Sequence, residues 1–240
     1  MKVRVKFKKE GSMRFIGHLD VMRFFQKMMR RADIPIAFSS GFSPHMIMSF
    51  ASPLGIGLTS AGEYFDIEIT EPIPSQKALQ QMNDTTVDGI AIVSFIEISP
   101  EKKWTGMSIL AGASYRVTIL AKEDTWEMDI SSMLAAFLAQ PEIVVLKKTK
   151  RSEEMVNIKS SIYEIKQGMD SNSSQLVLDM TLSAGSRENL KPHLVAEAFL
   201  TFIDKKASNF FYHRTEMYAN VGSDDAKELV SLESLGREII

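Results

Sequence analysis

Two histidines near the start of the chain are the side chains best suited to acid–base chemistry. His18 is followed by Asp20, Arg14 and Arg23 flank this pair, and His45 lies in the same basic segment. Imidazole can move a proton and guanidinium can stabilise phosphate charge, and metal-independent cleavage of RNA at its 2′-hydroxyl requires only these two functions. In the alternative, structural interpretation, Asp20 and His18 satisfy free amides in the first turn of a helix. The sequence favours the structural role for Asp20 and leaves both roles open for His18.

A polar, turn-rich loop extends from residue 39 to residue 45 with the sequence SSGFSPH. Consecutive backbone amides in such a loop can bind an anion. The alternative is a β-turn that joins two strands and needs Gly and Pro only for its geometry. Phe42 distinguishes the two, because an exposed ring can stack on a base whereas a buried ring only anchors the loop. The candidate binding residues of the loop are Ser40, Gly41, Phe42 and His45.

A second candidate anion site lies in the segment SAGSRENLKPH, from residue 183 to residue 193. We expect this segment to join a strand to a helix that has Pro192 in its first turn. Arg187 and Lys191 would then lie near the helix N-terminus, where phosphate is bound favourably. The alternative is a loop without a ligand, in which Asn189 caps the helix.

Positive charge is concentrated in the first fifth of the chain. Residues 1–50 contain ten Lys and Arg against three Asp and Glu, a net charge of +7, whereas the other residues carry −9. The apolar periodicity from His18 to Ala32 predicts an amphipathic helix with a separate basic stripe. The stripe consists of Arg23, Lys27, Arg30 and Arg31. Such a face indicates an anionic partner, of which nucleic acid is the commonest large one, or else a solvated helix face beside an acidic protein surface.

Several kinds of catalytic site are excluded by motif and composition. The chain has no phosphate-binding P-loop, no G-x-S-x-G elbow and no H-E-x-x-H pair. It has no cysteine, and its four histidines are not spaced as helical metal ligands, so we expect no metal and no cofactor. No run of 18 apolar residues and no secretory signal is present, so we expect a cytoplasmic protein without a membrane partner.

The pattern of apolar residues predicts an α+β fold in which the order β-α-β-β-β-α-β occurs twice. In the first half we expect strands at 3–9, 36–39, 46–52, 63–70 and 90–98, and helices at 18–32 and 74–83. In the second half we expect strands at 115–121, 143–148, 156–165, 175–183 and 210–218, and helices at 130–139 and 192–205. This order favours two ferredoxin-like domains, each an antiparallel-rich sheet with its helices on one face.

The expected domain boundaries follow from this repeat. Residues 1–100 form the N-terminal domain with the basic helix and the 39–45 loop, and residues 113–219 form the C-terminal domain. The segment 100–112 is expected to be a linker. Residues 220–240 are expected to be a tail that forms a short amphipathic helix or frays.

The first segment resembles a bacterial family described as radical-SAM-associated, or radical-SAM-linked, proteins of unknown function. The residues that carry this resemblance are Arg14, Phe15, Gly17, His18, Leu19, Asp20, Arg23, Arg30, Arg31, Ala32, Pro35, Ser40, Gly41, Phe42, Pro44, His45, Ser49, Phe50, Leu54, Gly57 and Glu63, with Asn189 and Pro192 in a weaker second motif. The resemblance spans nearly the whole chain, and its specific part is about the first seventy residues. Ser43 and Met46 depart from the family pattern, in which Asn and Pro are common.

The resemblance implies an accessory role beside a separate radical SAM enzyme. A chain without cysteine cannot supply the thiolates of that enzyme's iron–sulfur cluster. Combined with the basic segment, this favours a substrate-recognition module that binds RNA or a ribonucleoprotein for the partner enzyme.

Two alternatives belong to other functional classes. The first is a metal-independent endoribonuclease that uses His18 or His45, by analogy with the fold and charge of CRISPR repeat-processing enzymes. The second is a protein–protein scaffold with an apolar contact patch. The patch would comprise Met22, Met28, Met29, Met46, Ile47 and Met48.

Topology predicts where the two histidines lie. In a β-α-β unit the second strand runs parallel to the first, so its carboxyl end lies where the helix begins. His18 starts the helix and Ser40 follows the expected strand at 36–39. We therefore expect His18 and His45 to face one cleft, with Arg14 and Arg23 beside it.

Overall fold

The chain folds into two compact α+β units. The computed structural model describes residues 1–122, 126, 128–148, 153–169, 174–223 and 226–240. Unit 1 comprises residues 1–112 and 214–240, and unit 2 comprises residues 113–213. This division differs from the expected boundaries, because the segment from 214 onward returns to unit 1 instead of completing the second domain.

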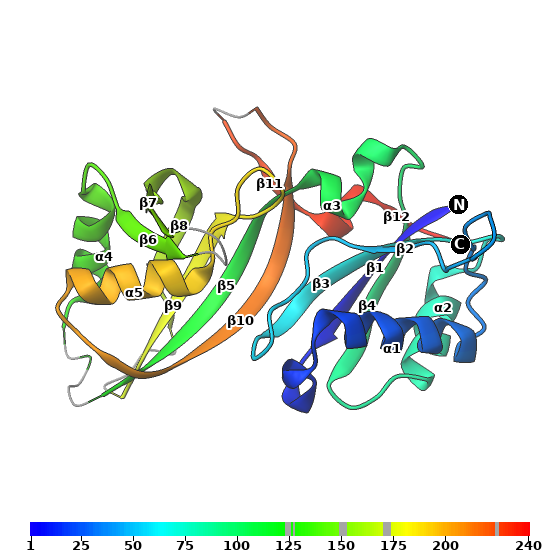
Figure 1. The fold of residues 1–240 in the computed structure, drawn as a ribbon, viewed down its shortest axis with the longest axis horizontal. Coiled ribbons are helices and arrows are strands. Elements are labelled where there is room, and N and C mark those ends of the chain that lie inside the picture. The colour runs from blue at the N-terminus through cyan, green and yellow to red at the C-terminus, as the bar shows by residue number, and fades with distance from the viewer. Residues whose placement is uncertain (123–125, 127, 149–152, 170–173, 224–225) are drawn as a thin grey trace. The chain divides into compact units, whose positions relative to one another are not determined.

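Unit 1 is built on an antiparallel sheet with two main helices (Figure 1). Its elements are β1 (Lys2–Lys9), α1 (His18–Arg31), β2 (Met48–Phe50), β3 (Thr59–Glu68), α2 (Ser75–Asp84), β4 (Ile90–Glu97), α3 (Gly106–Ile109), β11 (Leu229–Ser231) and β12 (Arg237–Glu238). The strand order is β12-β4-β1-β3-β10, with β2 paired to β3 and β11 paired to β10. The order β4-β1-β3-β2 with two crossover helices is ferredoxin-like, so the expected fold class is confirmed for this unit.

Both helices of unit 1 cover the same face of its sheet. The apolar side of α1, formed by Val21, Phe25, Met28 and Met29, is buried. It packs against the alternate residues Val3, Val5 and Phe7 of β1, and the ring centroids of Phe7 and Phe25 lie 4.6 Å apart. Ala78 and Met82 of α2 join the same core. Burial of this apolar side orients α1 so that its opposite, basic side faces solvent.

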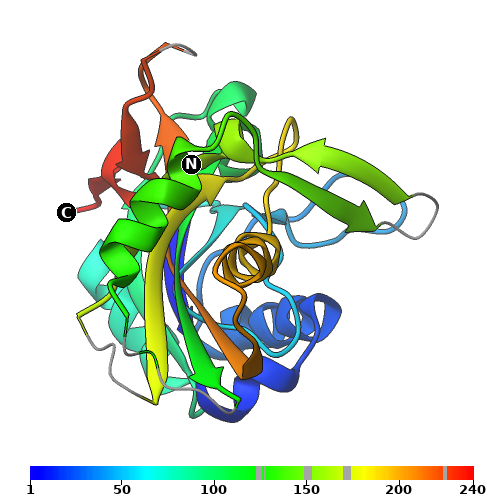
Figure 2. The ribbon, with the colours of Figure 1, turned by 90° about the vertical axis from the view of Figure 1, so that its left-hand side faces the viewer.

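Unit 2 repeats the arrangement with an inserted hairpin. Its elements are β5 (Leu110–Ala121), α4 (Ile130–Ala139), β6 (Val144–Lys148), β7 (Glu153–Asn157), β8 (Ile162–Gln167), β9 (Gln175–Ser183), α5 (Pro192–Phe202) and β10 (Ala207–Asn220). Residues 110–112 of β5 and 214–220 of β10 belong to unit 1. The strand order is β10-β5-β9-β8, and β6 and β7 pair only with each other. Figure 2, in which α5 is seen end-on, shows this hairpin apart from the strands of the unit 2 sheet.

Two expected strands differ from the structure. The segment 36–39 forms only isolated bridges, from Ile36 to Ile69 and from Phe38 to Met46, because it turns into the loop before a ladder can form. The strand expected at 156–165 is two strands separated by a 3-10 turn. The side chain of Asn157 causes this break, because its Oδ1 accepts hydrogen bonds from the backbone N–H groups of Ile143 and Lys159.

The C-terminal segment is part of unit 1. It contributes β11, a 3-10 turn at Leu232–Leu235, and β12, which pairs with β4. Ser75 and Ile239 are joined twice, since the Ser75 N–H donates to the Ile239 carbonyl and the Ile239 N–H donates to the Ser75 Oγ, each over 2.8 Å. The expectation of a helical or frayed tail is therefore wrong for the described part of residues 220–240; residues 224 and 225 lie outside it.

Candidate nucleic-acid interface

The solvent side of α1 carries a row of exposed cations. Arg23, Lys27 and Arg30 are all exposed, and their spacing of four and three residues places them on one side of the helix. Asp20 is the only acid in α1, and its Oδ1 lies 3.3 Å from Arg23 Nη1. Within the described part of the chain, Lys27 and Arg30 have no ion-pair partner. We call Arg23, Lys27 and Arg30 the α1 stripe.

The net charge of residues 1–50 overstates the charge on this surface. Arg4 and Lys9 are 1% and 2% exposed, and Arg4 forms a buried ion pair with Asp66. Lys6 is held between Glu216 and Glu233 at 2.8 and 2.6 Å. Arg4 and Lys6 therefore neutralise acids inside unit 1, whereas the α1 stripe and Arg31 stay exposed on the helix.

Arg31 and Arg14 do not extend the α1 stripe. Arg31 Nη2 donates to the carbonyl of Thr85 over 3.3 Å, which turns its guanidinium toward the end of α2. Arg14 is half-buried, its carbonyl accepts a hydrogen bond from Gly57 N–H, and its guanidinium lies 4.7 Å from the ring centroid of Phe15. Their predicted role in ligand binding stays a prediction.

His18 packs against an aromatic side chain of unit 1. It is half-buried at the first residue of α1, and its ring meets the Phe50 ring edge-on with centroids 5.0 Å apart. The N-cap is Gly17, which contributes no side-chain hydrogen bond. The structural role expected for Asp20 was to satisfy free amides in the first turn of the helix. In the structure its carboxylate pairs with Arg23 instead, and its backbone N–H donates to the Gly17 carbonyl.

The 39–45 loop is closed by its two end residues. The Ser39 N–H donates to the His45 carbonyl over 2.8 Å, and the His45 N–H donates to Ser39 Oγ over 3.1 Å. The His45 Nδ1 atom also lies 2.9 Å from the same Oγ, so the imidazole helps to close the loop. At the tip, Gly41 has a φ of +108° and Phe42 is fully exposed. The ring of Phe42 therefore does not anchor the loop.

The expectation that His18 and His45 share a cleft is wrong. Phe50, which contacts His18, is the last residue of β2 and pairs with Phe65, in the middle of β3. His45 lies five residues before Phe50 on the same extended segment. Next to it along the chain, Ile47 donates its N–H to the Ala37 carbonyl and accepts from the N–H of Glu68, the last residue of β3. Five extended residues span about 16 Å. The prediction placed residues 36–39 in the position that β2 occupies in the sheet. It therefore put the 39–45 loop at the wrong end of the sheet.

The Met-rich patch expected for a scaffold lies in the core. Met28 and Met29 are fully buried and Met46 is 5% exposed. Met22 and Met48 are half-buried and pack against the same core. These side chains fill unit 1, so this patch is not available to a partner.

The second candidate anion site lies in unit 2. Arg187 and Lys191 are exposed, and Pro192 begins α5 as expected. The N-cap is Lys191 instead of Asn189, because the Leu190 N–H bonds back to Ser183 and carries the chain past Asn189. The neighbouring Glu188 accepts a hydrogen bond from Ser161 Oγ. The assignment of Arg187 and Lys191 to anion binding stays a prediction.

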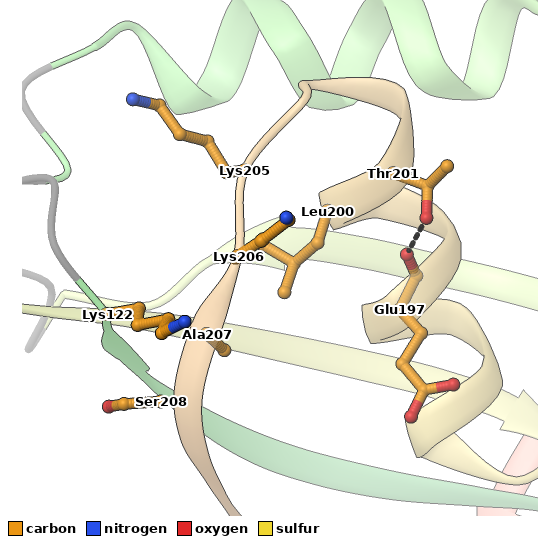
Figure 3. A pocket seen from close by; sticks show the side chains of 8 residues that line it. All are labelled: Lys122, Glu197, Leu200, Thr201, Lys205, Lys206, Ala207 and Ser208. Atoms are coloured by element: carbon orange, nitrogen blue, oxygen red, sulfur yellow. Dashed lines mark hydrogen bonds between the residues drawn. The ribbon is translucent and has the colours of Figure 1, made fainter.

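A pocket of about 520 Å³ lies at the carboxyl end of α5, with three lysines at its rim (Figure 3). The lysines are Lys122, Lys205 and Lys206. The pocket's Thr201 Oγ1 donates to the Glu197 carbonyl, and the Lys205 N–H donates to Leu200 as the helix ends. Cations following a helix C-terminus stabilise its dipole, so Lys205 and Lys206 have a structural explanation that needs no ligand, whereas Lys122 follows β5.

The sequence did not indicate a buried polar layer on the helix-free side of the unit 1 sheet. Arg4 and Lys6 alternate with apolar residues in β1, a pattern typical of a strand with one solvated face. Arg214 is 3% exposed and pairs with Glu63, whose Oε2 lies 2.6 Å from Arg214 Nη2. In the sequence, the one indication of this layer was the acidic residues of β3. That they lie opposite these cations becomes evident only when the pairing of the strands is known.

The described residues contain no group of three or more His, Asp or Glu side chains able to hold a metal ion. Among these same residues, no helix is long and apolar enough to cross a membrane.

Comparison with known proteins gives a fold relationship and a family. The chain is similar in structure to a chain in the "Crystal Structure of a Cbf5-Nop10-Gar1 Complex", with a TM-score of 0.51 and 10% sequence identity. The similarity covers 90% of this chain and 48% of that chain, so this chain spans about half its length. At this identity the likeness shows a shared fold alone. No curated protein matches the sequence. Residues 2–192 match a bacterial family, and the chain therefore belongs to the family described as "Uncharacterized protein conserved in bacteria (DUF2344)".

Proposed function

We propose that this protein is an accessory module that binds RNA, free or in a ribonucleoprotein, along the exposed side of α1. The observation that carries the proposal is the α1 stripe: three exposed cations on one helix side in a chain whose formal net charge is −2. Cations held in a row on a rigid element fit a ligand with regularly spaced phosphates.

The expected binding is electrostatic and moderate in strength. Each phosphate neutralised on a single strand contributes about −0.7 to the slope of log K against log salt, so three cations predict a slope of about −2. Such contacts position a ligand without reading its sequence. This behaviour suits a module that holds a substrate for another protein.

The chemistry is proposed to belong to a partner. The described residues do not bring His18 and His45 together, so nothing in unit 1 favours the endoribonuclease alternative. We propose that the partner is a radical SAM enzyme, a proposal that rests on the sequence resemblance at the start of the chain. The absence of cysteine requires the cluster thiolates to come from that partner.

The test is RNA binding by fluorescence anisotropy at several salt concentrations. The variant R23Q/K27Q/R30Q removes the α1 stripe but keeps side chains compatible with a helix. We expect its affinity to fall at low salt and its salt slope to approach zero. The control K77Q/K103Q/K166Q removes the same charge from exposed lysines elsewhere and should bind as wild type. Equal affinity of the stripe variant and the wild type would contradict the proposal.

The proposed partnership needs its own measurement. The purified chain should co-elute with a co-expressed radical SAM enzyme from the same genome in size-exclusion chromatography. Nuclease treatment before the run distinguishes direct contact from bridging by RNA. Separate elution in both conditions would remove the partner from the proposal and leave RNA binding untouched.

A further inference from the structure

Two exposed phenylalanines of unit 1 are not explained by packing within the chain. Phe42 is fully exposed and Phe15 is 63% exposed. A phenyl ring in water forgoes the free energy that burial against another surface would provide. Exposed aromatic rings next to cations are typical of surfaces that stack nucleic-acid bases.

Phe42 is presented by an ordered loop. The hydrogen bonds between Ser39 and His45 close the loop at its base, and the bridge from Phe38 to Met46 continues this pairing into the buried Met46. Because the loop is closed before any ligand arrives, little conformational entropy is lost when the ring takes up a partner.

Phe15 belongs to an apolar platform at the beginning of α1. The guanidinium of Arg14 lies over its ring. Gly57 N–H donates to the Arg14 carbonyl, which brings the segment of Ile56 to the start of α1, and Ile56 and Leu19 are 66% and 61% exposed. Ile56 approaches the start of α1, since a Cβ built on Gly17 would make an ordinary contact of 3.7 Å with Ile56 Cδ1. We call Phe15, Leu19 and Ile56 the Phe15 platform.

The α1 stripe runs between the two aromatic sites. Leu19 lies four residues before Arg23, on the same side of the helix, so the platform is continuous with the start of the stripe. At the other end, the chain leaves α1, pairs Ile36 with Ile69, and enters the loop that carries Phe42. Figure 1 shows the end of α1 and the loop before β2 on the same side of unit 1. From Leu19 to Arg30 the helix rises about 16 Å.

We infer that the ligand of this face is a single strand, with unpaired bases stacked on Phe15 and Phe42 and its phosphates on the α1 stripe. This inference rests on the proposed function and specifies its substrate class. A duplex keeps its bases inside the stack, and the deep, narrow major groove of A-form RNA excludes side chains. At about 3.4 Å per stacked nucleotide, 16 Å corresponds to about five nucleotides.

The experiment compares F15A and F42A on two labelled ligands, an unstructured uridine-rich RNA and a blunt RNA duplex of equal length. Loss of one stacking contact should weaken binding of the single strand about tenfold and leave duplex binding unchanged. The salt slope should stay at its wild-type value in both variants, since no phosphate contact is removed. The control F211A removes an exposed phenylalanine of unit 2 and should bind as wild type.

The outcomes separate this inference from the proposed function. Specific loss of single-strand binding in either variant supports it. Unchanged binding in both variants, with loss in R23Q/K27Q/R30Q, overturns the single-strand inference while RNA binding stands; the exposed rings would then serve a protein partner. Equal loss on single strand and duplex also overturns it. A wild-type chain that binds neither RNA would overturn both proposals.

Discussion

The Arg4 guanidinium and the Asp66 carboxylate form a two-pronged ion pair on the helix-free side of the unit 1 sheet. Arg4 Nε lies 2.8 Å from Asp66 Oδ1, and Arg4 Nη2 lies 3.1 Å from Oδ2. Arg4 also donates to the carbonyls of Trp104 and Leu232, while Asp66 accepts from Gly106 N–H. The pair therefore ties the segment after β4 and the C-terminal segment to β1 and β3.

Replacing Arg4 by Met should destabilise unit 1 severely. The substitution leaves the Asp66 carboxylate buried without its cation, which costs about 3–5 kcal/mol. Urea unfolding followed by tryptophan fluorescence measures the change. R4M/D66L should regain only part of the loss, because the carbonyls of Trp104 and Leu232 stay unpaired. K103M at the exposed Lys103–Glu101 pair is the control and should change stability by less than about 1 kcal/mol.

Replacing Gly62 by Ala should also destabilise unit 1. A Cβ at this position would lie 2.8 Å from the Thr215 carbonyl oxygen and 2.9 Å from Glu216 Cα, both backbone atoms of β10. Backbone cannot rotate away, so the strands must separate at a cost of about 1–3 kcal/mol. G55A is the matched control, since its nearest atom is Leu58 Cδ1 at 3.6 Å. Equal urea midpoints for the two variants would show that β3 and β10 are not packed this closely.

His18 should act through its ring shape and not through proton transfer. H18F keeps an aromatic ring against Phe50, so its stability and RNA affinity should stay near wild type. H18A loses the edge-on contact, worth about 0.5–1.5 kcal/mol beyond the buried area. Thermal unfolding and anisotropy measure the two properties. A folded H18F chain that no longer binds or processes RNA would contradict this prediction and indicate that the imidazole of His18 takes part in the chemistry.

The sequence predicted those elements that local periodicity determines. The apolar positions of α1 and the alternation in β1 gave nearly correct bounds for both. The same alternation does not show that Arg4 and Lys6 are covered, because the covering segments, near Trp104 and Leu232, are far away in sequence. Burial by distant segments leaves no local pattern, and this layer was therefore missed.

The candidate site was predicted in its residues but not in its geometry. The α1 stripe is exposed as expected, because helical spacing alone separates it from the apolar side. The position of His45 depended on which short segment pairs with β3, and a three-residue β2 gives too little pattern to decide this from sequence. The exposure of Phe42 likewise depended on tertiary packing, as a loop phenylalanine is compatible with either state.

The stability of unit 1 should decrease at alkaline pH because of Lys6 and Tyr64. Burial lowers the pKa of Lys6, but hydrogen bonds and charge from Glu216 and Glu233 outweigh this effect and leave the pKa above its usual 10.5. Burial, followed by the charge of Glu216, raises the pKa of Tyr64 above its usual 10.0, and the phenol donates to Glu216 Oε1 over 2.6 Å.

Both shifts have the same sign. Above about pH 10 the unfolded chain loses these protons while the folded chain keeps them, so the free energy of unfolding falls as pH rises. Lys9 acts in the opposite direction, because burial lowers its pKa and its contribution improves toward pH 10.5. Urea unfolding from pH 8 to pH 11 should show a net decline, because the pKa shift of Tyr64 is larger than that of Lys9. Y64F removes one source of the decline and should flatten the curve. A wild-type curve that stays flat to pH 11 would show that Lys6 and Tyr64 are more solvated than their contacts with Glu216 imply.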